Sequence, residues 1–145
     1  MEIRDALDKI SFESLAIENS NLNTTVKLEQ QPRFEGVIGF RPQWQLGRMD
    51  VSLRLKAFAN EDLIFDMSFL TSFSQIVFET FTETGTTELK PILKMVLAGL
   101  SFSTARGIIF QIFASLTGSS IILPIVRPEL LIQDSGFEVS QSPPS

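Results

Sequence analysis

The chain of 145 residues contains no cysteine, no histidine and no tyrosine, and these absences exclude several kinds of site. Without cysteine there is no disulfide, no thiolate nucleophile and no zinc–thiolate centre. Without histidine or cysteine, the Ser-His-Asp and Cys-His arrangements of nucleophilic enzymes cannot be built within the chain. The sequence also holds no glycine-rich phosphate loop, dinucleotide fingerprint or zinc-protease motif. We therefore predict that the protein is not an enzyme and has no catalytic residue, metal ligand or cofactor.

Positive charge is also sparse. Lysine and arginine number 12 against 17 aspartates and glutamates, the formal net charge is −5, and the basic residues form no run. A nucleic-acid binder needs a basic face that displaces counterions from phosphates, so nucleic acid is not a predicted partner. The first ten residues carry charges throughout and lack the apolar core of a signal peptide, which predicts the cytoplasm.

One uncharged stretch, from Gly107 to Val126, is long enough to cross a bilayer as a helix. Its centre, however, holds the small and polar residues Thr117 to Ser120, and Pro124 stands near its end. This pattern indicates a helix, a turn and a buried extended segment, so no membrane insertion is predicted.

Two adjacent stretches alternate strictly between apolar and polar residues. The apolar positions are Met49, Val51, Leu53, Leu55, Ala57 and Ala59 in the first, and Leu63, Phe65, Met67, Phe69 and Phe73 in the second. A period of two predicts half-buried antiparallel strands, with a tight hairpin near Asn60. Shorter alternating stretches at 10–17 and 24–29 complete a predicted four-stranded antiparallel sheet.

The next part of the chain predicts a long broken helix from Glu88 to Gly118. An apolar stripe runs to Leu100, is interrupted around Gly99, and restarts at Ala105 with apolar residues on nearly all sides. One sheet face cannot cover so much apolar surface, so the surplus must meet a second subunit, a membrane or a client. Ile109, Phe113 and Leu116 are the predicted oligomer contacts. Arg106 either holds a carboxylate across that interface or extends its charge to solvent at the rim.

Residues 30–47 read as a long connection rich in glycine and proline. It contains Phe34, Phe40 and Trp44, which is the only tryptophan. These aromatics either pin the connection to the core or contact a ligand. The polar residues 133–145, which end in Ser-Pro-Pro-Ser, predict a flexible tail after a single domain over 1–132.

The order of these elements resembles the SecB family of protein-export chaperones. The resemblance covers residues 10–132 and is carried by Ile10-Ser11-Phe12-Glu13, Val26-Lys27-Leu28-Glu29, Asp50 to Leu55, Ala105-Arg106, Gly118, and Leu123-Pro124-Ile125-Val126. The Ala-Arg pair in the helix and the proline-containing segment after the helix are the best matches.

The resemblance implies a SecB-like fold, a four-stranded sheet packed with a long helix, and a dimer of dimers with helices between sheets. It implies apolar grooves for unfolded precursors, with no nucleotide or cofactor, and Val26 and Leu28 match the second-strand apolar pair of the family groove. The family also docks a translocase motor on an acidic face, with an acidic residue and then glycine in the fourth strand. This chain has Asp66 there but no glycine. Its partner is therefore either a Sec translocase motor or a dedicated client, such as a toxin–antitoxin pair.

We thus predict a cytoplasmic α+β protein that forms a homo-oligomer, dimer or tetramer, and acts as a chaperone (holdase) for unfolded or precursor polypeptides in protein export or for a dedicated client. The predicted client contacts are Val26, Leu28, Phe34, Phe40 and Trp44. The predicted interface is Ile109, Phe113 and Leu116, with Arg106 at its rim. The alternative is a dimeric small-molecule-binding α+β domain with an apolar pocket.

Overall fold

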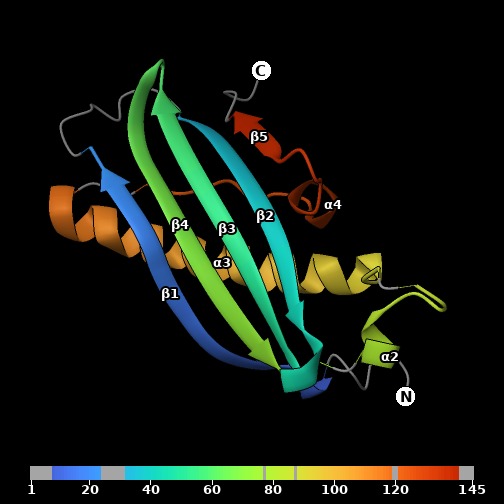
Figure 1. Cartoon of the computed structure of the whole chain (residues 1–145). Helices are drawn as coiled ribbons and strands as arrows, with labels where there is room; N and C mark the ends of the chain where they lie inside the picture. Colours follow the sequence, from blue (N-terminus) through green and yellow to red (C-terminus); the bar gives the residue numbers. More distant parts are fainter. Residues whose placement is uncertain (1–7, 24–31, 77, 87, 119–120, 141–145) are drawn as a thin grey trace.

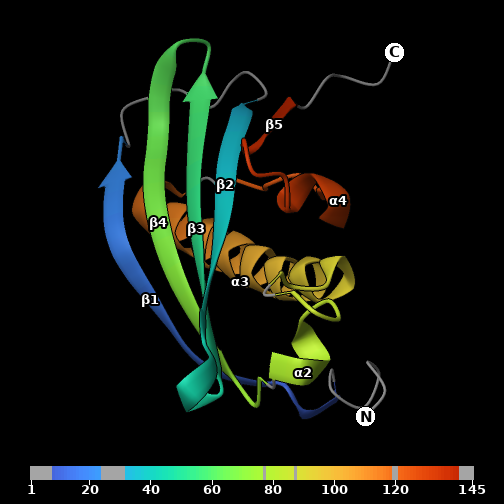
Figure 2. The same ribbon diagram turned by 45° about the vertical axis from the view of Figure 1, so that its right-hand side comes forward.

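The computed structural model describes residues 8–23, 32–76, 78–86, 88–118 and 121–140. They form one antiparallel sheet of order β1-β4-β3-β2-β5, with a long helix lying across one face (Figure 1). The strands are β1 (Ser11–Leu22), β2 (Arg33–Gln43), β3 (Arg48–Ala59), β4 (Asp62–Ser74) and β5 (Phe137–Ser140). The helices are α2 (Phe78–Phe81), α3 (Pro91–Thr117) and α4 (Pro128–Leu131), with a 3-10 turn, η1 (Trp44–Leu46). Figure 2 shows α3 and α4 on the same side of the sheet.

The predicted central hairpin is confirmed. β3 and β4 pair along their whole length, and Asn60 makes the turn with a left-handed backbone angle φ of 58°. The alternation holds because one face of both strands packs under α3 and the other faces away from it. A register irregularity between Ala57 and Phe58 changes the start of β4, so that Ile64, rather than Leu63, is fully buried.

The predicted connection over 30–47 is wrong, because most of it is strand β2. Phe34 and Ile38 face the core while Val37 and Arg41 are exposed, so the period of two is present. Glycine and proline disfavour strands on average, but β2 is stabilised by pairing with β3 along all its residues. The predicted strand at 24–29 lies outside the described residues. Among the described residues, the second strand along the chain is β2, and the sheet has five strands where four were predicted.

The tail expected from Gln133 onward is corrected in the same way. Residues 137–140 form β5, which pairs antiparallel with β2, opposite Arg33 to Gly36. Phe137 is buried and packs edge-to-face against Phe102, with ring centroids 6.0 Å apart. One buried aromatic and a partner strand order a segment whose composition is otherwise polar.

Helix α3 is continuous over 27 residues, so the predicted break is also wrong. Both apolar stretches share one helix, which begins at Pro91 and ends at Gly118, where φ is 73° and the backbone N–H bonds to the Ala114 carbonyl. Its buried side comprises Leu93, Leu97, Ala98, Ser101, Phe102, Ala105, Ile109 and Phe113. By length and a mean hydropathy of 1.5, α3 could cross a membrane, a test that core helices of soluble proteins also pass.

Candidate functional site

An apolar groove lies between α3 and the segment that leads into α4. We call it the α3–α4 groove, and its volume is about 670 Å³. It is lined by Ile92, Met95, Val96, Gly99, Leu100, Phe102, Ser103, Arg106, Ile125, Val126, Pro128, Glu129 and Leu131. Ile92 and Leu100 are exposed, and 87% of Ile125 is accessible to solvent. A row of exposed large apolar side chains beside a hollow is typical of a binding surface.

The segment after α3 forms one wall of the groove because it is fixed along the helix. Ile121, Leu123 and Val126 are buried, while Ile122 and Ile125 point outward. The segment has no regular secondary structure, so its backbone groups need other partners. Arg106 supplies one, since its Nε–H donates a hydrogen bond of 2.7 Å to the Leu123 carbonyl oxygen. The Arg106 side chain therefore ties the wall to the helix.

Replacing Arg106 with alanine should lower the free energy of unfolding by about 1–2 kcal/mol, because a carbonyl loses a charge-assisted hydrogen bond. Urea denaturation followed by Trp44 fluorescence measures this. Arg127→Ala is the matched control, since Arg127 is an exposed arginine on the same segment and surface substitutions usually change stability by less than about 0.5 kcal/mol. Equal effects of the two substitutions would contradict the role given to Arg106.

The groove contains few polar side chains. Apart from Arg106, its polar side chains are Ser103 and Glu129, which are exposed. Within the part of the chain that the structure describes, no group of acidic residues could hold a metal ion. The buried carboxylate of Asp50, elsewhere in the sheet, is satisfied by Gln43 Nε2 at 2.6 Å and Ser72 Oγ at 2.8 Å. That carboxylate has a structural role, because its hydrogen bonds link β2, β3 and β4.

The predicted client contacts are not brought together in this groove. Phe34 is buried against Phe65, with ring centroids 6.5 Å apart, so it pins β2 to the core. Phe40 is partly buried, with Lys94 Nζ 5.9 Å from its ring centroid, and Trp44 is partly buried in η1. Val26 and Leu28 lie outside the described residues. The interpretation that the aromatics pack against the core therefore fits Phe34. None of Phe34, Phe40 and Trp44 lines the groove.

The predicted interface residues are divided by the fold. Ile109 and Phe113 are 0% and 1% exposed, because they face the sheet, where Phe113 packs against Phe65. They are unavailable to a second subunit, so their assignment is corrected to the protomer core. Leu116 is 60% exposed at the end of α3. Arg106 Nε bonds to the Leu123 carbonyl of its own chain, and its place at the rim of an interface stays a prediction.

Sequence reasoning missed the residues that open the groove, above all Ile125 and Leu100. Leu100 belongs to the predicted helical stripe, and Ile125 to the proline-containing segment that matched the family pattern. Periodicity marks such residues as apolar but does not reveal which of them stay uncovered, because exposure depends on the neighbouring element.

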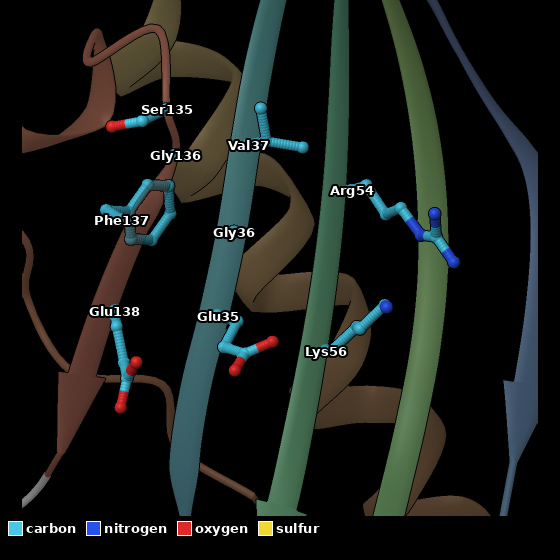
Figure 3. A pocket seen from close by; sticks show the side chains of 9 residues that line it. All are labelled: Glu35, Gly36, Val37, Arg54, Lys56, Ser135, Gly136, Phe137 and Glu138. Atoms are coloured by element: carbon cyan, nitrogen blue, oxygen red, sulfur yellow. The ribbon is translucent and has the colours of Figure 1, made fainter.

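A second hollow, of about 350 Å³, lies on the other face of the sheet and is polar. Figure 3 shows Glu35, Arg54 and Lys56 there, with Glu138 of β5 nearby. Arg54 holds Asp66 through two hydrogen bonds, of 3.0 and 2.8 Å. Hydrogen bonding to Arg54 lowers the pKa of Asp66 from its ordinary value of 3.8, and the charges of Arg54 and Lys56 act in the same direction. The hollow therefore carries both signs of charge.

This ion pair predicts an acid-dependent part of stability. A carboxyl with a lowered folded-state pKa stabilises the protein above its unfolded pKa, and that contribution is lost as pH falls from about 5 through the folded pKa. Wild-type protein should therefore lose more stability than Asp66→Asn between pH 6 and pH 2.5, as measured by denaturant midpoints. Parallel pH profiles for the two proteins would contradict this prediction.

A solved structure shares this arrangement. A SecB-like chaperone of Mycobacterium tuberculosis, solved in complex with a ChAD peptide from the HigA1 antitoxin, superposes with a TM-score of 0.62 over 86% of this chain and 95% of its own, at 9% sequence identity. The chain has a SecB-like fold. The SecB-like sheet here has five strands, with β5 at its edge. A protein of unknown function from Streptococcus agalactiae matches at a TM-score of 0.46 and 8% identity, over 81% of this chain and 98% of its own. The sequence itself matches no family model and no curated protein.

Proposed function

We propose that this protein is a SecB-like holdase that binds unfolded polypeptide in the α3–α4 groove. The observation that carries the proposal is the open row of Ile92, Leu100 and Ile125 along a groove of about 670 Å³. Each large apolar side chain that a client buries there contributes roughly 1.5–3 kcal/mol before ordering losses. An unfolded chain presents such side chains, whereas a native protein has already buried them. The groove therefore discriminates by foldedness and needs no reaction.

Assembly of the holdase would use the outward side of α3 near its C-terminal end. Gly107, Phe110, Gln111 and Ala114 are exposed there at helical spacing, and we call them the outer helix face. Phe110 supplies apolar area, and the small residues permit close approach of a second helix. Leu116, at the C-terminal end of α3, is the one predicted interface residue with an exposed side chain. We propose a dimer or tetramer built on this face.

The client is proposed to be a polypeptide met in the cytoplasm, either a precursor for export or a dedicated partner such as one member of a toxin–antitoxin pair. The Asp66 carboxylate is engaged by Arg54, so it is a weak candidate for docking a translocase motor. A dedicated client is therefore favoured over a Sec-type motor. The solved relative bound to an antitoxin peptide supports the same choice.

The test is suppression of aggregation of a slowly refolding protein, titrated with this chain, beside binding of the same protein in its native form. Binding of the unfolded form alone, at micromolar concentration, is the expected result. Binding of neither form would refute a general holdase. A lipid retained in native mass spectrometry would favour the small-molecule alternative, which the open, solvent-exposed groove does not favour.

A further inference from the structure

Strand β5 covers only a small part of the edge on which it lies. β2 has 11 residues, and β5 pairs with four of them, Arg33 to Gly36. From Val37 to Gln43, no described strand pairs with β2 on that side. The backbone groups of an unpaired strand edge are a template for another extended chain.

The paired part of this edge has a space beside Gly36 that an aromatic ring fills, and we call this space the Gly36 seat. A Cβ atom on Gly36 would lie 2.3 Å from Cζ of Phe137 and 2.9 Å from Cδ2 of Leu55, so only glycine leaves room for the ring. Gly136 approaches as closely, because its Cβ would lie 2.7 Å from the Gly36 carbonyl oxygen and its φ is +88°. The two glycines therefore let an extended segment with a following aromatic residue lie flat against β2.

The Gly36 seat adjoins the α3–α4 groove. Phe137 packs edge-to-face on Phe102, and Phe102 also lines that groove. A polypeptide in the groove and a strand on the β2 edge would thus share one aromatic wall.

The contacts that hold β5 are few. It has four residues, of which Phe137 is buried and Val139 is partly buried, and an ion pair joins Arg33 Nη1 to Glu138 Oε1 at 3.5 Å, with side chains that are 36% and 56% exposed. Short edge strands with few buried side chains are among the first elements to open.

We infer that the β2 edge with its Gly36 seat is a second binding site for an extended polypeptide carrying an aromatic residue, and that β5 occupies this site in cis as a displaceable strand. The inference rests on the proposed holdase function and deepens it. An intramolecular strand competes at an effective concentration in the millimolar range, roughly, so it lowers the apparent affinity for clients. A client displaces β5 because it can pair along all of β2, whereas β5 pairs with only four residues.

The site can be probed with a labelled synthetic peptide of residues 133–140, which must displace β5 to bind the full-length chain. Phe137→Ala in the protein weakens the cis strand and should raise peptide affinity at least tenfold. The same peptide with alanine at the position of Phe137 should not bind. Circular dichroism establishes that Phe137→Ala remains folded.

A variant in which a disulfide fixes β5 to β2 provides an independent test. Glu35 and Glu138 are directly opposed on β2 and β5, and the chain has no cysteine, so Glu35→Cys with Glu138→Cys gives one defined disulfide. Peptide binding should disappear in the oxidised protein and return on reduction, with the reduced form as its own control. Equal affinity of wild type, Phe137→Ala and oxidised protein would overturn the inference, as would absence of peptide binding to Phe137→Ala. Ile125→Asp should retain peptide binding, which separates failure of this site from failure of the groove.

Discussion

Replacing Ile125 with aspartate should weaken binding of unfolded protein at least tenfold and abolish suppression of aggregation at equimolar ratio. Ile125 is 87% exposed and lines the α3–α4 groove, so a charge there removes apolar contact area and must be desolvated when a client binds. The fold should be unaffected, because the side chain contacts little of its own protein. Isothermal titration with a permanently unfolded test protein measures the change.

The same segment offers a matched control in Ile122. It is 59% exposed and stands three residues earlier, but it does not line the groove. Ile122→Asp should keep client binding within about twofold of wild type, since it adds the same charge at a site away from the groove. Equal loss in both variants would mean that the effect is general electrostatic repulsion or misfolding, and would refute the groove as the client site.

Replacing Gly107 with glutamate should weaken self-association about a hundredfold or more, because a charge would be buried in an apolar contact. A side chain at this position meets nothing within 4 Å in the protomer, so the fold has room for it. Because glutamate favours helix over glycine, the protomer itself should become more stable by about 0.5 kcal/mol. Weaker self-association together with a more stable protomer would separate an interface effect from general damage to the fold.

Light scattering across a concentration series, with thermal unfolding of the dilute protein, provides both readouts. Gly107→Ala adds one methyl group to the same exposed position and should retain the oligomeric state while sharing the gain in helix stability. A wild-type protein that stays monomeric at every concentration would refute the assembly proposal. An unchanged oligomer in Gly107→Glu would place the interface elsewhere.

Local sequence patterns predicted the structure correctly where an element is stabilised by residues close to it in the sequence. The β3–β4 hairpin follows from alternation and a turn residue, because the two strands are each other's partners. The end of α3 at Gly118 was likewise predicted. These features depend on residues close in sequence, so the sequence contains the necessary information.

Prediction failed where a distant segment supplies the stabilisation. Composition argued for a loop at β2, but pairing with β3 outweighs the cost of its glycines. Composition argued for a flexible tail after Gln133, but the burial of Phe137 beside Gly36 orders β5. The apparent break around Gly99 disappears because the sheet supports α3 on both sides of that glycine.

The absence of histidine and cysteine, the acidic charge and the excess of apolar helix surface are properties of composition, and they led us to predict a binding role. Which apolar residues remain exposed depended on the fold. The sheet covers Ile109 and Phe113, whereas Arg106 holds a backbone segment that leaves Ile125 in solvent. Composition states how much apolar surface exists, but only packing decides which part of it remains uncovered, because burial is a property of pairs of segments far apart in the chain.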